Sequence, residues 1–529
     1  MEKRLIIATV LSVLVLLGFS YFYQFPLSPK KEAEKKDVVV AEKTPEAKKD
    51  ASAEGKALAK KAKQSPLPSE KEIIIETDLY RAILTNRGAV IKAWELKKYT
   101  ANGKSHVQLI PQVDGIIYPL SLETDGVDFN EKTFAIDKNS INLNKDKNKE
   151  TLTLTYTDPK GVKVEKRLTF YNDTYKIDID LSAEGIDKPL LFSIGSDFGI
   201  VDKTKTGYGS HIGAVASVDG KVKWDLPKKA GEAVQYQGKI AWAASEDKYF
   251  IASIIPKNKI DEVIVRKEEM ERFNTLIKFA KADKLNETLV LYAGPKEYSR
   301  LEAFRIGLEE TIPLGWFWFI ALPLFQLMKW LYKILGNYGI AIILITAIIK
   351  VIFAPLTHKS YKSMKEMQKL QPKITALQKK FKDDKQKLNI EMMGLYKTHK
   401  VNPVSGCLPM VIQIPVFIAL YNVLSYAIEL RHAPFFWWIQ DLSAMDPYYI
   451  FPVVMGISML IQQWMTPAAP TADPIQSKMM LLMPVIFTFM FLSFPSGLVL
   501  YWLVNNVLSI AQQVVTNRYL TPPPSAEAA

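Results

Sequence analysis

The chain has 529 residues, of which 48% are hydrophobic and 23% charged, with 68 Lys+Arg against 55 Asp+Glu. This length exceeds that of a single compact domain. A single cysteine, Cys407, excludes an intramolecular disulfide framework. We find no HExxH pattern, no Cys/His cluster with zinc spacing, no Walker-type loop and no GxGxxG or GxSxG motif. The common enzyme signatures are therefore missing, and the sequence predicts no cofactor.

Residues 1–27 are predicted to anchor the chain in a membrane. The apolar run Leu5–Tyr23 follows Lys3 and Arg4 and ends in an aromatic cluster, with no small-x-small cleavage site after it. A cleaved signal peptide is the alternative, but we favour an uncleaved anchor whose N-terminus lies inside. Residues 28–72 are mostly Ala, Glu, Lys, Asp and Pro. Such a segment cannot bury apolar surface, so we expect a disordered linker.

Residues 73–296 predict one antiparallel β domain. Segments such as Thr151–Tyr156 and Tyr175–Leu181 alternate between apolar and polar residues, and Gly, Asn and Asp turns separate them. We favour a sandwich over a barrel, and it lies outside if the first segment is an anchor. His106 and His211 belong to this domain, but they are far apart in sequence and have no identifiable carboxylate partner, so they give little support to an active site.

Residues 297–336 are predicted to form an amphipathic helical region at the outer membrane interface. The apolar residues of Glu297–Ile312 recur at helical spacing, which indicates a helix lying on the membrane surface. The following stretch, Leu314–Leu335, is apolar enough to span a membrane. If it spanned, however, the Lys-rich loop 358–402 would lie outside, against the positive-inside rule. We therefore place this stretch in the interface.

Five further spans then alternate across the membrane. The second transmembrane helix is predicted at 337–357, and four more lie within 403–517, which leaves 518–529 as a short cytoplasmic tail. The four are Ser405–Ile428, Tyr448–Met465, Met479–Phe494 and Gly497–Thr516. The third of these is near the lower length limit for a span, so local thinning of the bilayer is expected beside it.

The loop 358–402 is predicted to be a cytoplasmic helical hairpin. Apolar residues recur at helical spacing on both sides of Asp383 and Asp384, which are good N-cap residues. Two interpretations stay open for its many lysines. They either fix the topology alone, or they form a docking surface for an acidic partner such as ribosomal RNA or anionic lipid.

Lys350 is the only charge well inside any of the five C-terminal spans. At ~1.5 Å per residue it lies ~18 Å from the outer end of its predicted span and ~10 Å from the inner end. Thr346 precedes it by four residues and shares its helical face. The lysine could simply extend its side chain to the cytoplasmic interface. Intramembrane charge, however, usually marks a functional cavity.

Two further spans carry polar stripes. The first runs along Gly497–Thr516 and the second along Ser405–Ile428. Their members are Tyr501, Asn505, Ser509 and Gln512, and Gln413, Asn422, Ser425 and Glu429. Hydrogen bonds between helices would explain any one of these residues. Three polar stripes together with a cation favour the wall of a hydrated groove, because a lipid-facing position would be costly for such groups.

The C-terminal half, roughly residues 335–517, resembles a known family. The motifs that carry the resemblance are Asp383-Asp-Lys-Gln-Lys387, Lys400-Val-Asn-Pro403, Gly406-Cys-Leu-Pro409, Gln413-Ile-Pro415, Asp441-Leu-Ser443, Asp446-Pro-Tyr-Tyr449, Met483-Pro-Val-Ile-Phe487 and Phe494-Pro-Ser-Gly-Leu-Val-Leu-Tyr501. In this order and spacing they are similar to the YidC family of bacterial membrane-protein insertases. The N-terminal part matches the Gram-negative form of the family by architecture more than by motif.

The resemblance implies a multi-span α-helical membrane protein of the bacterial inner membrane. Its six transmembrane helices include a five-helix insertase core, both termini are cytoplasmic, and a periplasmic all-β supersandwich domain is inserted after the first helix. Such a protein is not an enzyme. It inserts newly made membrane proteins and helps them fold, without ATP hydrolysis. Its partners would be nascent membrane proteins, the Sec translocon with its accessory subunits, the translating ribosome and membrane lipid, but not DNA.

The resemblance also implies a hydrophilic groove that contacts the substrate. Lys350 occupies the position where the family usually has arginine, and Thr346, Gln413 and Tyr501 match groove positions. Asn505 joins this set through the stripe that it shares with Tyr501. Lysine offers a point charge and can lose its proton when desolvated, whereas arginine stays charged and forks to carboxylates. A strict carboxylate-fork role is therefore not expected of Lys350.

Two other classes of protein remain possible from the sequence. A transporter could use Lys350 as an ion or proton site, but it would predict paired intramembrane charges or a repeat between two halves. An envelope scaffold, in which the β domain binds and the spans only anchor, would leave the polar stripes unexplained.

Overall fold

The computed structural model describes residues 70–519 apart from 102–104, 126, 160, 203–210, 261, 383, 400, 403–407 and 466–473. The predicted anchor, 1–27, and nearly all of the predicted linker, 28–72, lie outside the described residues, as does most of the predicted tail, 518–529.

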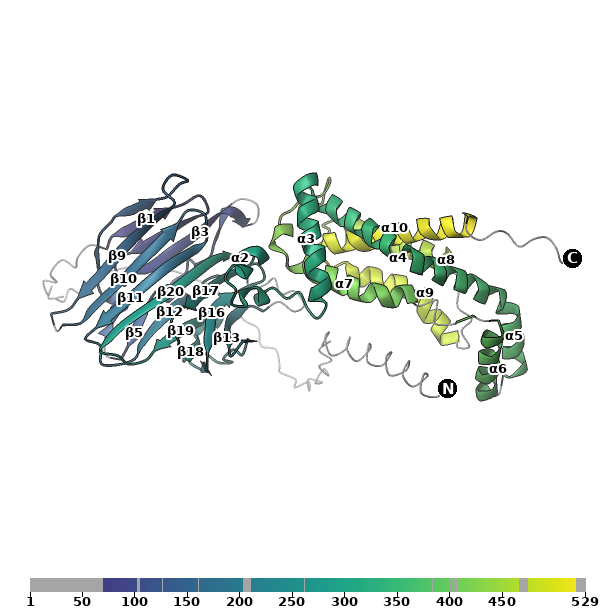
Figure 1. Cartoon of the computed structure of the whole chain (residues 1–529), viewed down its shortest axis with the longest axis horizontal. Coiled ribbons are helices and arrows are strands. Elements are labelled where there is room, and N and C mark those ends of the chain that lie inside the picture. The colour runs from purple at the N-terminus through teal and green to yellow at the C-terminus, as the bar shows by residue number, and fades with distance from the viewer. Residues whose placement is uncertain are drawn as a thin grey trace, which may run out of the picture. The chain divides into compact units, whose positions relative to one another are not determined.

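The first large region, from β1 to β20, contains three β-sheets (Figure 1). The five-stranded sheet has the order β4 (Ser105–Gln108), β3 (Val90–Ala101), β2 (Tyr80–Thr85), β1 (Glu72–Glu76) and β8 (Ser140–Asn142). The nine-stranded sheet has the order β14 (Lys221–Lys223), β13 (Gly213–Val218), β16 (Ile240–Glu246), β17 (Phe250–Pro256), β20 (Lys284–Pro295), β11 (Lys176–Glu184), β10 (Lys163–Tyr171), β9 (Lys149–Thr157) and β7 (Ala135–Ile136). The six-stranded sheet has the order β15 (Ala233–Gln237), β18 (Glu262–Lys267), β19 (Phe273–Phe279), β12 (Leu190–Ser196), β5 (Leu122–Thr124) and β6 (Val127–Asp128).

These sheets pack into a β-sandwich, as the alternating sequence pattern predicts. Nearly every pairing is antiparallel, and β1 with β8 is parallel. One continuous apolar cluster takes buried side chains from all three sheets, for example Ile73, Ile179 and Ile277. A sheet that is apolar on one face must bury that face against another layer, and here the three sheets bury each other.

Strand β10 follows the alternation of buried and exposed residues closely, and one of its buried positions is a lysine. Val164, Leu168 and Phe170 point inward, and Lys166 occupies an inward position between them with no exposed surface. Its ammonium donates hydrogen bonds to the carbonyls of Gly88 (3.0 Å), Ala89 (3.0 Å) and Leu120 (2.7 Å). Burial lowers the pKa of Lys166 to about 7. The three carbonyls replace the water that the ammonium loses on burial.

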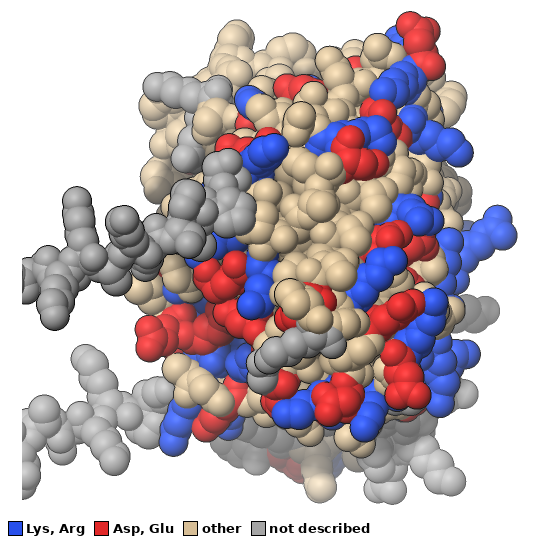
Figure 2. Space-filling model, turned by 90° about the vertical axis from the view of Figure 1, so that its left-hand side faces the viewer, with Lys and Arg blue, Asp and Glu red and all other residues tan. Residues whose placement is uncertain are grey.

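The surface of this β domain carries both signs of charge. Figure 2 shows one face, on which Lys and Arg side chains are interspersed with Asp and Glu around an uncharged area. Ion pairs of the β domain such as Arg167–Glu165 and Lys147–Glu150 likewise bring opposite charges together. On this face the mixed charge favours solubility and gives no single-sign field of the kind that binds nucleic acid.

The prediction of one surface helix over Glu297–Ile312 is wrong. The segment forms a short helix, α2 (Tyr298–Glu302), and a 3-10 turn, η3 (Leu308–Thr311), separated by a break in which Gly307 has φ 74°. Leu301, Leu308 and Ile312 are buried in the same apolar cluster as the β-sheets. These apolar side chains therefore pack against the β domain and not against lipid.

The second region is helical. After α3 (Trp318–Leu335) come α4 (Tyr338–Lys369), α5 (Gln371–Lys380), α6 (Lys385–Thr398), α7 (Leu408–Tyr426), the 3-10 turn η5 (Ile428–Leu430), α8 (Ile450–Met465), α9 (Pro474–Phe491) and α10 (Ser496–Tyr519). Gly336, with φ 66°, ends α3, and the Asn337 side chain caps α4 by accepting from the backbone N–H of Ile340. Figure 1 shows α3 lying across the ends of α4 and α7.

The predicted boundary between span 337–357 and hairpin 358–402 falls inside a helix. Helix α4 continues for twelve residues beyond Thr357, because the basic residues that follow are good helix formers and no breaker intervenes before Leu370. The hairpin itself is α5 and α6, and Asp384 caps α6 by accepting from the backbone N–H of Lys387 (2.9 Å). A small cluster of Met367, Leu370, Ile374 and Tyr396 joins the hairpin to the end of α4.

Two helices of the described chain are long and apolar enough to cross a membrane, namely α4 and the part Ser496–Thr516 of α10. Three shorter apolar helices also coincide with predicted spans: Val411–Tyr426, Ile450–Met465 and Leu482–Phe491.

Candidate functional site

Lys350 lies on α4 and reaches toward α10. Its Nζ donates a hydrogen bond to Ser509 Oγ at 2.6 Å. Lys350 is ~18 Å along the helix from Tyr338 and ~13 Å before Lys359, the first of the lysines that follow. Within the part of the chain that the structure describes, no carboxylate forms an ion pair with Lys350. The side chain is therefore directed at a neighbouring helix and not at a counter-ion.

The direction of this hydrogen bond is determined by Ser509 itself. Its Oγ donates to the carbonyl of Asn505, one turn earlier on α10, at 2.7 Å. A hydroxyl has one proton, so the oxygen that faces Lys350 can only accept. Ser509 is 5% exposed, which removes competition from bulk water.

A second polar contact joins α7 to α10 two turns away from Ser509. The Gln413 side-chain amide donates to the hydroxyl of Tyr501. Tyr501 is 1% exposed and belongs to the apolar cluster of the helical core. The structure thus places Gln413, Tyr501, Ser509 and Lys350 on three helices that face one another.

Thr346 and Asn505 differ in how their polar groups are used. Thr346 is 1% exposed, and its hydroxyl donates to the carbonyl of Ile342 at 2.7 Å, within its own helix. Asn505 is half-buried, and its Oδ1 has no hydrogen-bond partner among the described residues. An unpaired buried acceptor is costly unless something binds it. Asn505 is therefore the better-placed of the two for contact with an incoming chain.

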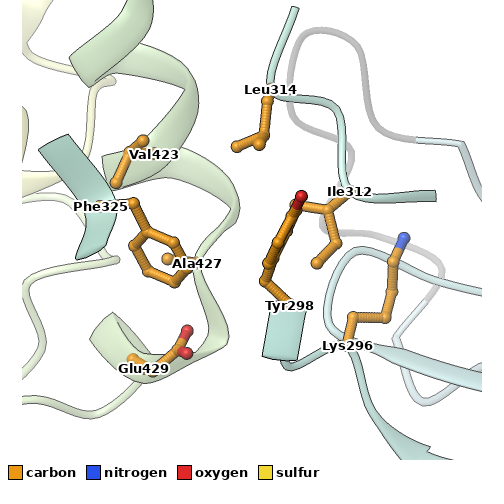
Figure 3. Close-up of a pocket in the computed structure, with 8 residues that line it drawn as sticks. All are labelled: Lys296, Tyr298, Ile312, Leu314, Phe325, Val423, Ala427 and Glu429. Carbon is orange, nitrogen blue, oxygen red and sulfur yellow. The ribbon is translucent and has the colours of Figure 1, made fainter. Parts of the chain in front are cut away.

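The outer part of the α7 stripe serves a different contact. Asn422 donates to the carbonyl of Leu314 at 2.8 Å, and Glu429 lies 3.5 Å from Lys329 of α3. Figure 3 shows Glu429 beside a small cavity that Phe325 and Leu314 also line. Sequence spacing grouped Asn422 and Glu429 with Gln413, but the structure gives them to the segment around α3.

Sequence reasoning missed a second polar face of α10. Asn506 donates to Ser458 Oγ (3.0 Å), and Gln513 donates to the carbonyl of Met465 (2.6 Å), both on α8. Asn506 and Gln513 are seven residues apart, which is two helical turns, so their periodicity was visible in the sequence. Both residues form hydrogen bonds between packed helices. This is the role that, for polar residues in a span, is the alternative to lining a groove.

The helical hairpin exposes apolar as well as basic side chains. Ile390 is 70% exposed and Met393 is 42% exposed on α6.

The histidines of the β domain are not brought together: His106 lies on β4 of the five-stranded sheet, whereas His211 precedes β13 of the nine-stranded sheet. His211 contacts the carbonyl of Ala214 (2.9 Å), and burial lowers its pKa. In the described ranges no group of three or more His, Cys, Asp or Glu side chains could hold a metal ion.

A β-sandwich followed by an apolar helical core with internal polar contacts defines a class of protein, a membrane protein that carries a large β domain. The comparisons with known proteins agree with this class. The model of the YidC periplasmic domain matches residues 72–327, and that of the 60Kd inner membrane protein matches residues 330–523.

Curated relatives extend this similarity to the whole chain. The membrane protein insertase YidC of Syntrophus aciditrophicus is 43% identical over 98% of this chain and all of its own length. Its counterpart from Geobacter sp. strain M21 is 44% identical over 85% of this chain and 86% of its own length. The chain therefore belongs to the YidC family of membrane protein insertases. It is an inner-membrane insertase with a periplasmic β domain, and it is not an enzyme.

Solved structures give weaker similarities. An active YidC insertase with its first transmembrane domain resolved covers 86% of this chain and 94% of its own, at 21% identity and a TM-score of 0.37. A putative aldose 1-epimerase from Escherichia coli K12 covers 42% of this chain and 99% of its own, at 10% identity and a TM-score of 0.27. Scores this low carry no argument about function.

Proposed function

We propose that this protein inserts newly made membrane proteins through a polar path inside the membrane, formed by Lys350, Thr346, Gln413, Tyr501 and Asn505. The observation that supports the proposal is the Lys350 ammonium, which lies inside the predicted span 337–357, is hydrogen-bonded to a hydroxyl and has no carboxylate counter-ion among the described residues. A cation in that condition attracts an acidic substrate segment. Nascent membrane proteins are the substrates that an insertase acts on.

The membrane arrangement that suits this function has six spans. Five of them correspond to α4, α7, α8, α9 and α10, and the anchor in 1–27 would be the sixth. The lysines of α4 beyond Thr357 and of α5 and α6 put the hairpin in the cytoplasm by the positive-inside rule. Both termini are then cytoplasmic, the linker 28–72 and the β domain 73–296 are periplasmic, and α3 lies in the outer interface.

The physical problem that such a path solves is the transfer of polar chain across hydrocarbon. Each polar group that loses water without a replacement partner costs several kcal/mol, on the order of 2–7. A hydrated half-depth path shortens the apolar barrier, and a short apolar segment such as Leu482–Phe491 of α9 thins the bilayer beside it. The apolar segment of the substrate then partitions into lipid, and burial at ~25 cal/mol per Å² supplies the driving free energy.

The partners that fit this function meet the chain on two sides of the membrane. The basic α5–α6 hairpin, with exposed Ile390 and Met393, suits contact with the translating ribosome, anionic lipid and emerging apolar segments. The Sec translocon and its accessory subunits would act beside the core when a substrate needs them. DNA has no part in this function.

The proposal is tested by site-specific crosslinking to a ribosome-stalled nascent membrane protein. A photo-crosslinker at Asn505 is preferable to one at Thr346 or Tyr501, because those two side chains are nearly inaccessible. The matched control is Val507 on the same helix, which is 50% exposed. We expect substrate crosslinks at Asn505 to peak when the apolar segment has just emerged. Equal yields at Asn505 and Val507 would contradict the path and return the polar stripes to helix packing.

A further inference from the structure

The contact between Lys350 and Ser509 carries an inference about the role of Ser509, and it rests on the proposed function. Lysine side chains in membrane helices extend toward the nearest aqueous interface when nothing holds them. Lys350 instead points to α10, a helix that lies beside α4 in Figure 1, and its Nζ is 2.6 Å from Ser509 Oγ.

The orientation of the Ser509 hydroxyl is set by a hydrogen bond within its own helix, independently of Lys350. Its proton goes to the carbonyl of Asn505 at 2.7 Å, so its lone pairs are aimed at the space that Lys350 enters. The ammonium has three N–H donors, and the hydrogen bond to Ser509 uses one of them. Asn505 Oδ1, on the same face of α10, has no partner among the residues that the structure describes.

We propose that Ser509 is the positioning residue of the insertion path, holding the Lys350 ammonium against α10 and leaving its other two N–H groups for an acidic substrate segment. Asn505 Oδ1 adds a neighbouring acceptor for an N–H of the same segment. Recognition then takes one carboxylate and one amide donor, which is the chemistry of a peptide segment containing Asp or Glu.

A lysine at position 350 needs a residue such as Ser509 to orient its charged group. The guanidinium of arginine keeps its charge and spreads five donors over a rigid plane, so it can bind a carboxylate with two parallel hydrogen bonds. An ammonium is a point charge on a flexible stem and has no such geometry of its own. The hydroxyl of Ser509 supplies the missing direction.

The test is a double-mutant cycle in the full-length protein, assayed for insertion of two substrates that differ only in an acidic or a neutral translocated tail. We expect Lys350→Met and Ser509→Ala each to lower insertion of the acidic tail about fivefold or more, with little change for the neutral tail. If Ser509 acts only through Lys350, then Ser509→Ala has no additional effect in the Lys350→Met background.

Two further variants make the cycle decisive. Ser509→Thr keeps a hydroxyl that can bond the carbonyl one turn earlier, so it is expected to retain insertion of the acidic tail. Ser493→Ala removes an exposed hydroxyl just after α9 and serves as the control. Equal losses with both tails, or a further loss when Ser509→Ala is added to Lys350→Met, would overturn the positioning role. If Lys350→Met itself shows no preference for acidic tails, the electrostatic part of the proposed function fails instead.

Discussion

Two lysines in this protein are removed from bulk water in different ways. Lys166, in the β domain, donates to three backbone carbonyls within 3.0 Å, so every proton of its ammonium is used by the fold. Lys350, in the helical core, contacts one hydroxyl and keeps two donors without a described partner. A fully paired ammonium can only stabilise structure, whereas a partly paired one can still bind something else.

The largest effect of a substitution is expected at Lys166, because all three donors of its ammonium are hydrogen-bonded. Lys166→Met would leave the carbonyls of Gly88, Ala89 and Leu120 without their donor in a site that water does not reach. We expect the free energy of unfolding of the β domain to fall by about 3 kcal/mol. Pulse proteolysis of the full-length protein in urea measures it. Lys163→Met, an exposed change on the same strand, is the control, and an equal loss there would contradict the role of the three carbonyls.

A smaller and more selective effect is expected where the pairing is incomplete. Lys350→Glu replaces the attracting charge by a repelling one, so insertion of a substrate with an acidic translocated tail should fall about tenfold, equivalent to ~1.4 kcal/mol. A neutral tail should change by about twofold or less, because desolvation of its polar groups is unaffected. Insertion efficiency in proteoliposomes measures both, and equal losses would refute the electrostatic attraction.

A third prediction concerns a buried carboxylate of the β domain. Glu246 lies 2.8 Å from Lys296 with both side chains buried, and burial raises the pKa of Glu246 to about 7 although Lys296 and its hydrogen bond oppose this. Asp247, the neighbouring acid, also has a pKa raised by burial. A carboxyl group whose pKa is raised on folding contributes stability that is present below pH 4.5, its unfolded value, and is lost as the pH rises through 7.

We therefore expect the β domain to lose stability between pH 5 and pH 7 by on the order of 1 kcal/mol through Glu246. Glu246→Gln cannot ionise, so this part of the pH dependence should disappear in that variant. Thermal unfolding at a series of pH values measures it. An unchanged slope in Glu246→Gln would assign the dependence to Asp247 or to other groups.

The local patterns of the sequence predicted most of the elements. Strand alternation was sufficient to expect a β-sandwich within 73–296, and apolar length was sufficient to locate α4 and α10. The same patterns failed at Glu297–Ile312, where apolar residues at helical spacing proved to cover the β domain around a break at Gly307. Spacing shows that a segment has an apolar side, but it does not say whether lipid or protein covers that side.

Which residues share a helical face can be read from the amino-acid order alone, because it depends only on the 3.6-residue period. Tyr501, Asn505 and Ser509 could be grouped in this way. The partners of such residues depend on how the helices pack: Gln413 donates to Tyr501, whereas Asn422 donates to the carbonyl of Leu314, although both lie on α7. Likewise, no residue close to Lys166 in sequence predicts the carbonyls that accept its hydrogen bonds, because they come from segments 46 to 78 residues away. Partners of this kind are brought together by long-range packing, which local periodicity does not encode.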